Sequence, residues 1–281
     1  TKRVYYRTYD VTGQVRKGAN VLGGVLAAGW YSGYVGFGGK RDHYGQKPRF
    51  AAQLHVEFDD GTATDIVTNK DWKTATGPLL EADFLMGETY DARKDLGAWS
   101  EPGFDAAKTW DAVDVGAEVQ PVVQADPGPP VRVVGTFKPK SIKEPTPGAY
   151  VLDLGQNFAG IARLRLQGEP GQKITLRFAE RLNPDGTIYT TNLRSARCID
   201  TYTCKGGDIE TWEPRFTFHG FQYVEITGLK AAPTEDTVTG LALSGDTPVV
   251  GPFTCSDPML NQLHRNIYWT QRPNFLDIPT D

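Results

Sequence analysis

Residues 256–281 read SDPMLNQLHRNIYWTQRPNFLDIPTD, and their pattern differs from everything before them. Ser256 can cap the start of a helix, and Pro258 fits a first turn, where the missing N–H of proline costs no hydrogen bond. The apolar side chains that then share one helical face are Leu260, Leu263 and Ile267. Pro273 is expected to end the helix. The stretch predicts a helical domain that begins here and is not completed, so we expect the chain to be a piece of a larger protein.

The residues before this stretch alternate between apolar and polar side chains and are punctuated by 31 glycines and 19 prolines. Residues 54–58 and 62–67 flank an Asp-Asp-Gly sequence at 59–61, which is typical of a tight β-hairpin. Residues 8–12 and 15–23 predict another strand, turn and strand. Together these patterns indicate a first β-sandwich.

A second block of predicted strands follows a proline-rich linker at residues 123–130, where proline disfavours ladder hydrogen bonds. The alternating segments of this block are residues 162–166, 172–178 and 222–227, with a turn at 183–187. The block ends near Pro248. Two β domains are therefore expected ahead of the helical segment.

The overall composition bounds the class of protein. The 281 residues are enough for two domains, and 39% hydrophobic and 23% charged residues fit a soluble globular protein. The net charge of −4 gives no electrostatic case for binding nucleic acid or an anionic membrane. No apolar run reaches the ~18 residues of a transmembrane helix, and no signal peptide is visible. The sequence does not distinguish a cytoplasmic protein from an exported one.

The three cysteines do not form a disulfide framework. In one extended strand, the Cα atoms of Cys198 and Cys204 would lie ~20 Å apart, far beyond disulfide reach. We expect all three to be free, buried thiols. The cysteines and the four histidines also lack zinc-site spacing.

An acidic segment at residues 81–91 is a candidate calcium site. It contains Glu81, Asp83, Glu88 and Asp91, and calcium takes six to eight oxygen ligands. The alternative is a polar loop in which each carboxylate is solvated or caps a turn. Both interpretations are open from the sequence.

Two further features have a functional and a structural interpretation. Residues 29–39 mix aromatic rings with glycines, which suits either a sugar-binding face or packed strands with bulges. His219 lies between aromatic residues without a Ser or Cys nucleophile pattern, so we expect a half-buried histidine with a satisfied hydrogen bond. With 34 acidic residues in the chain, pairs of carboxylates carry no information by themselves.

Four long motifs, in order, resemble bacterial-type α-L-rhamnosidases of glycoside hydrolase family 78. They are residues 150–160 (YVLDLGQNFAG), 176–186 (LRFAERLNPDG), 212–221 (WEPRFTFHGF) and 274–281 (NFLDIPTD). Residues 29–31 and 87–93 resemble the jelly-roll module at the N-terminus of that family.

The resemblance implies a mainly β fold with two β-sandwich domains, of jelly-roll or concanavalin-like type, ahead of a truncated (α/α)6 barrel. We place an incomplete N-terminal module at residues 1–118, the second sandwich at 119–248 and the start of the barrel at 249–281. The resemblance also implies hydrolysis of terminal, non-reducing α-L-rhamnose with inversion, in which two carboxyl groups act as general acid and general base.

The same resemblance assigns the site residues. Asp281 matches an aspartate that contacts the rhamnose hydroxyls, whereas the residues matching the acid and the base are expected beyond this chain, which therefore holds no catalytic residue. Asn20 lies where some members have an Asp-Asn pair that contacts calcium and sugar, but Ala19 stands in place of the aspartate and removes a charged oxygen. No cofactor is expected for catalysis, and a calcium ion in the N-terminal module is left open.

Three functions follow as hypotheses. The first is part of an inverting α-L-rhamnosidase that is inactive by itself, with a rhamnose-containing glycoside and the rest of the barrel as partners. The second is a carbohydrate-binding module. The third is a structural platform for the barrel, whose helix alone cannot bury its apolar face and should pack on the second β domain or fray.

Overall fold

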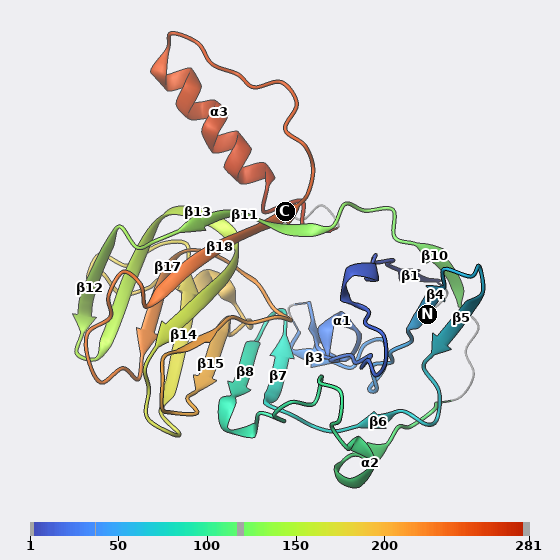
Figure 1. Cartoon of the computed structure of the whole chain (residues 1–281). Helices are drawn as coiled ribbons and strands as arrows, with labels where there is room; N and C mark the ends of the chain where they lie inside the picture. Colours follow the sequence, from blue (N-terminus) through green and yellow to red (C-terminus); the bar gives the residue numbers. More distant parts are fainter. Residues whose placement is uncertain (1–2, 37, 117–120, 278–281) are drawn as a thin grey trace.

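The structure is a computed structural model that describes residues 3–36, 38–116 and 121–277. Its largest element is a ten-stranded sheet with the order β11-β18-β13-β17-β14-β15-β8-β7, in which β12 and β16 also pair with β13 (Figure 1). The strands are β7 (Leu79–Asp83), β8 (Gly87–Asp91), β11 (Val131–Phe137), β12 (Ser141–Thr146), β13 (Ala149–Leu166), β14 (Lys173–Ala179), β15 (Ile199–Thr203), β16 (Glu210–Trp212), β17 (His219–Thr227) and β18 (Val238–Gly245). The strands predicted at 162–166, 172–178 and 222–227 are confirmed within β13, β14 and β17.

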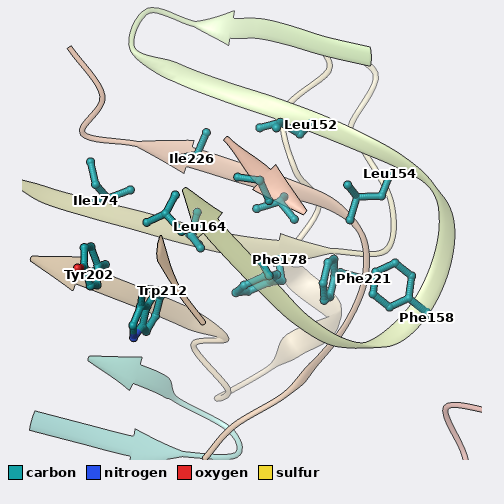
Figure 2. Packing of buried hydrophobic residues seen from close by; sticks show 14 of the residues in the cluster. Leu152, Leu154, Phe158, Leu164, Ile174, Phe178, Tyr202, Trp212, Phe221 and Ile226 are labelled. Carbon is teal, nitrogen blue, oxygen red and sulfur yellow. The ribbon is translucent and has the colours of Figure 1, made fainter. Parts of the chain in front are cut away.

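The sheet curls around the long strand β13, whose first half pairs with β17 and whose second half pairs with β18 and β16. Side chains from these strands meet inside the curl (Figure 2). The largest fully buried ones include Phe158, Phe178 and Phe221, each at most 2% exposed. Phe221 lies 4.7 Å from Phe158 and 4.8 Å from Phe178 between ring centroids, so the three rings form a continuous contact. Burial of this apolar surface is the main stabilising contribution to the domain.

Residues 3–125 contain short two-stranded pieces as well as β7 and β8. They are β1 (Arg3–Tyr6) with β10 (Val122–Ala125), β2 (Tyr34–Val35) with β3 (Lys40–Arg41), β4 (Gln53–Glu57) with β5 (Ala63–Val67), and β6 (Lys73–Thr74) with β9 (Asp111–Ala112). The β4–β5 pair confirms the predicted hairpin. Short helices lie at α1 (Gly29–Ser32) and α2 (Ala106–Thr109), with single 3-10 turns at Thr12–Gln14, Ala92–Lys94 and Thr191–Leu193.

The strand-turn-strand predicted over residues 8–23 is wrong. A 3-10 turn occupies Thr12–Gln14, and residues 15–23 form no strand. The cause is local hydrogen bonding, because Asp10 accepts from the Thr12 N–H at 2.9 Å and Asn20 accepts from the Arg16 N–H at 2.9 Å. Short polar side chains that bond their own backbone in this way compete with a strand ladder.

The β7–β8 pair joins the N-terminal region to the large sheet. Strand β8 runs parallel to β15, with Thr89 opposite Thr201 and Asp91 opposite Thr203. Residues 79–91 therefore belong to the same sheet as residues 131–245 (Figure 1). The proposed domain boundaries at 118 and 248 stay predictions.

Helix α3 (Pro258–Gln271) projects from the sheet (Figure 1). Its N-cap is Asp257 and not the predicted Ser256, since the Asp257 carboxylate accepts from the Met259 N–H at 2.8 Å. The helix ends before Pro273, as predicted. The face that carries Leu260, Leu263 and Ile267 is 44–56% exposed. Contact with the sheet runs instead through Trp269, which packs edge-on against Phe137 at 5.4 Å between ring centroids.

All three cysteines are free, as predicted, but only Cys204 is buried, whereas Cys198 and Cys255 are partly exposed. Among the described residues, no helix has the length and apolar character needed to cross a membrane.

Candidate functional site

A cavity of about 310 Å³ lies between β13 and α3. Polar side chains and one indole ring dominate its lining, which consists of Gln156, Asn157, Phe158, Ala159, Glu180, Gly220, Asn266, Trp269, Thr270, Pro273 and Asn274. The residues come from a bulge in β13, the end of β14, one position of β17, and α3 with the turn after it. Segments more than a hundred residues apart in the sequence therefore build one site.

The bulge in β13 presents Gln156 and Asn157 to the cavity. Asp153 pairs with Tyr223 and Phe158 pairs with Phe221, so four residues of β13 face a single residue of β17. The extra length requires a turn, which begins at Gly155 with a φ of +73°. Asp153 fixes this turn by accepting from the Gly155 N–H at 2.7 Å. The bulge is thus a defined feature that directs two amide side chains out of the sheet.

A carboxylate is held beside the bulge. Glu180 follows the last residue of β14, and its Oε1 accepts from the Asn157 side-chain amide at 2.9 Å. Gly220 faces it from β17, where an added Cβ would lie 3.9 Å from Glu180 Oε1. The open space above Gly220 leaves room for a ligand next to the carboxylate.

Helix α3 supplies the opposite wall. Asn266, Trp269, Thr270 and Pro273 are spaced as i, i+3, i+4 and i+7, so they share one face. This polar and aromatic face is distinct from the exposed apolar face of Leu260, Leu263 and Ile267. The helix therefore turns its hydrogen-bonding side toward the bulge and its apolar side to solvent.

The donor and acceptor set determines what the cavity can do. Amide side chains offer both donors and acceptors, whereas among the described residues no lysine or arginine lines the space and Glu180 is the single carboxylate. Hydrolysis of a glycoside needs two carboxyl groups. The cavity is suited to binding an uncharged polar molecule and carries no acid and base pair.

A second polar cluster lies buried between β8, β15 and β17. Glu88, Asp200 and His219 are each at most 3% exposed. Asp200 Oδ1 accepts from the Glu88 backbone N–H at 2.9 Å and lies 3.0 Å from His219 Nε2. Glu88 Oε2 accepts from the backbone N–H groups of Arg215 and Phe216 at 2.9 and 3.0 Å. These bonds connect the N-terminal region to the large sheet.

The pKa values of Glu88 and His219 in this cluster are raised above their ordinary values. Burial, together with the nearby charge of Asp200, raises the pKa of Glu88 from 4.5 to about 7, against the opposing effect of the two backbone donors. Burial alone would lower the pKa of His219, but the charge and hydrogen bond of Asp200, with a smaller contribution from Cys198, outweigh it and raise that pKa from 6.5 to about 9. This shift favours the protonated imidazole beside Asp200.

His219 has the predicted hydrogen-bond partner at Nε2, but it is more deeply buried than expected, and its Nδ1 is buried without a hydrogen-bond partner among the described residues. Its ring stacks on Phe178 at 4.2 Å between centroids. No local pattern indicates that Glu88 and Asp200 are its neighbours, because Glu88 lies 112 residues before Asp200 and the strand of His219 pairs with neither of theirs in a simple hairpin.

The acidic segment at 81–91 behaves as a polar structural segment. Asp83 accepts from the backbone N–H groups of Tyr34, Leu85 and Met86, and Asp91 pairs with Arg93 at 2.8 Å. Glu81 pairs with Arg197. Within the residues that the structure describes, no three His, Cys, Asp or Glu side chains gather as metal ligands would. These contacts are those that the loop interpretation expects, and calcium binding stays a prediction.

The remaining candidates lie away from the cavity. Asn20 is exposed, and its amide bonds the backbone of Arg16 and Gly18. Trp30, in the aromatic and glycine segment, packs on Phe84 at 4.9 Å between centroids, which favours the packing interpretation at this residue. Asp281 lies outside the described residues.

Sequence reasoning missed the cavity beside α3. A usable signal was present, since Gly-Gln-Asn at residues 155–157 interrupts an otherwise apolar strand. Glycine followed by polar residues inside a strand pattern indicates a bulge. The contribution of Trp269 and Asn266 could not be read in this way, because nothing in the local pattern shows which helix face meets the bulge.

Three family models match the chain in order. The α-L-rhamnosidase N-terminal domain matches residues 1–135, the bacterial α-L-rhamnosidase concanavalin-like domain matches 143–244, and the bacterial α-L-rhamnosidase 6 hairpin glycosidase domain matches 248–281. An α-L-rhamnosidase of Streptomyces avermitilis is 52% identical and one of Formosa agariphila is 39% identical, each aligned with 100% of this chain. The chain spans 27% and 30% of the length of these two relatives.

Solved structures show the same arrangement. The crystal structure of Streptomyces avermitilis α-L-rhamnosidase complexed with L-rhamnose matches with a TM-score of 0.93 and 49% identity, covering 100% of this chain and 27% of that one. Native α-L-rhamnosidase from Aspergillus terreus matches with a TM-score of 0.85 and 36% identity, covering 90% of this chain and 29% of that one.

Proposed function

Because the chain belongs to the bacterial α-L-rhamnosidase family, as its motifs predicted, we propose that it forms the β-rich part of an inverting α-L-rhamnosidase. The mainly β fold, the concanavalin-like domain and the start of the helical glycosidase domain are in place. The substrate of the whole enzyme is terminal, non-reducing α-L-rhamnose in a glycoside or polysaccharide. The ordered match to three domains of one family is the observation that carries this proposal.

In the proposed reaction, a carboxylic acid protonates the leaving oxygen while a carboxylate activates water, and the two groups stand ~6.5–9.5 Å apart. We place both groups outside these 281 residues. The match to the glycosidase domain covers only residues 248–281, and the described lining of the cavity beside α3 holds one carboxylate, which supports this placement. The chemistry needs no cofactor, and Asp281 is proposed to contact the rhamnose hydroxyls.

The assay is hydrolysis of an aryl α-L-rhamnoside by the purified chain. The expected result is release of phenol at the rate of the buffer blank. Hydrolysis clearly above the blank, retained through a second purification, would contradict the absence of the acid and the base.

A second candidate function is carbohydrate binding without catalysis, which the cavity beside α3 favours. It predicts saturable heat when L-rhamnose is titrated into the chain in a calorimeter, and a calcium requirement would point to the N-terminal region. If no heat appears with or without calcium, this candidate is rejected.

The exposed apolar face of α3 favours a third function as a platform for the rest of the helical barrel. Leu260, Leu263 and Ile267 are then expected to become buried against that barrel. Hydrogen exchange on α3 should slow when the remaining chain is supplied, and unchanged exchange would argue against this role.

A further inference from the structure

We propose that the cavity between the β13 bulge and α3 is a binding subsite for one neutral pyranose residue. The choice of a sugar as ligand rests on the proposed glycosidase function. The site itself rests on the side chains that line it, none of which the family match assigns to sugar binding.

The size of the cavity limits the ligand to a single residue. Its volume of about 310 Å³ is at the lower end of the ~300–1,000 Å³ that small-molecule sites occupy. An oligosaccharide would extend into solvent, whereas one pyranose ring fits inside.

The charges of the lining select an uncharged ligand. Glu180 contributes one negative charge, and the described part of the lining holds no cation to balance a carboxylate, sulfate or phosphate. An anionic sugar would face the Glu180 carboxylate directly and would be repelled. Sugar hydroxyls, by contrast, can donate to the Glu180 oxygens and accept from the amides.

The polar groups are already held in position. Asn157 donates to Glu180 at 2.9 Å, and Asn266 accepts from the Gln262 amide at 2.7 Å, so its own NH₂ group can donate to a ligand. Gln156 donates to the Asn157 carbonyl at 2.9 Å, so its side-chain oxygen can accept. Groups that are positioned before binding lose little entropy when the ligand arrives.

Trp269 supplies the apolar surface. Its Cη2 atom lies over Gly135, where an added Cβ would be 3.3 Å away, and its ring meets Phe137 edge-on. These contacts fix the indole in the wall of the cavity. A flat ring beside hydrogen-bonding amides matches the C–H faces and hydroxyl edges of a pyranose.

The test is a titration of the 281-residue chain with methyl α-L-rhamnoside and, separately, methyl β-D-glucoside, followed by the indole N–H signals in an NMR spectrum. The signal of Trp269 is assigned by its loss in Trp269→Phe. Saturable movement of this signal with either sugar is expected, while the other indole signals stay in place. A glucuronide should bind at least about tenfold more weakly than the glucoside, because of the Glu180 charge.

Two variants on the same helix separate binding from folding. Asn266→Ala should weaken sugar binding about tenfold, since a donor to the sugar is lost. Leu263→Ser, on the exposed apolar face, should leave the affinity unchanged. Both variants keep dispersed indole signals if they fold, which makes the comparison independent of stability.

The proposal is overturned if the Trp269 signal fails to move with both sugars, if other indole signals move and Trp269 does not, or if the glucuronide binds as tightly as the glucoside. Activity of the longer enzyme is measured independently. A hydrolytically active enzyme whose Trp269 signal ignores both sugars would reject the subsite and leave the proposed function intact.

Discussion

His219 Nε2 lies 3.0 Å from Asp200 Oδ1, and both side chains are at most 3% exposed. The same Asp200 oxygen accepts from the Glu88 backbone, so one carboxylate joins β15, β17 and β8. This relationship links the N-terminal region to the curled sheet through charge as well as through strand pairing. The titration of Glu88 and His219 should therefore change the free energy of unfolding of the whole chain.

The first prediction concerns pH. The pKa of Glu88 is raised from 4.5 to about 7 in the folded chain, so its stabilising contribution is present below about pH 4.5 and is lost as pH rises to 7. The loss amounts to at most about 3 kcal/mol. Glu88→Gln keeps an oxygen acceptor and cannot titrate, so its free energy of unfolding should fall less between about pH 5 and about pH 7.5. Parallel curves for the variant and the natural chain would contradict the raised pKa.

His219 should add to the same trend at higher pH. Its pKa is raised from 6.5 to about 9, so its contribution is complete below about pH 6.5 and is lost as pH rises through 9. Denaturant unfolding measured at a series of pH values should show stability still falling above pH 7. A rise in stability across this range would show that the folded chain holds His219 neutral.

The second prediction is the cost of breaking the buried pair. Asp200→Asn leaves the imidazolium without its counter-charge and should destabilise the chain by about 3–5 kcal/mol. Arg197→Gln removes the exposed pair with Glu81 and serves as the control, with an expected loss of at most about 1 kcal/mol. Equal losses in the two variants would refute a special role for the buried pair.

The third prediction tests the start of α3. Asp257→Ala removes the carboxylate that caps the Met259 and Leu260 N–H groups and should reduce the stability of the helix by about 1 kcal/mol. Ser256→Ala should change it by a few tenths of a kcal/mol at most. The measurement is hydrogen exchange of the amides in the first turns of α3. Faster exchange in Ser256→Ala than in Asp257→Ala would mean that the cap is misassigned.

The fourth prediction concerns the β13 bulge. Gly155→Ala places a side chain at a φ of +73° and should cost about 1–3 kcal/mol. Gly148→Ala is matched in backbone strain, with a φ of +77°, but lies in an open turn away from the cavity. Both variants should lose stability, and only Gly155→Ala should also weaken the response of Trp269 to sugar. Equal sugar binding in the two would show that the bulge does not shape the cavity.

The sequence predicted the elements whose signals are local. The hairpin around residues 59–61, the alternating strands and the stop before Pro273 depend on neighbours in the chain, and all three are found. The strand predicted at residues 8–12 was wrong because Asp10 bonds its own backbone. The alternation of apolar and polar residues gives no information on this competing side-chain hydrogen bond.

The candidate site was harder to predict from the sequence. Its walls come from residues 156–159, 180, 220 and 266–274, and only the three-dimensional fold brings them together. The buried cluster of Glu88, Asp200 and His219 has the same property. A single sequence gives no signal for contacts between strands more than a hundred residues apart, whereas the family motifs could be recognised because each is contiguous.

The most direct test of the central claim is a chimeric enzyme. The chain replaces the matching 27% of the Streptomyces avermitilis α-L-rhamnosidase, and hydrolysis of an aryl α-L-rhamnoside is measured with an aryl β-D-glucoside as control. We predict a folded chimera that hydrolyses the rhamnoside and not the glucoside. A chimera that folds and releases no rhamnose would contradict the assignment of this chain to an α-L-rhamnosidase.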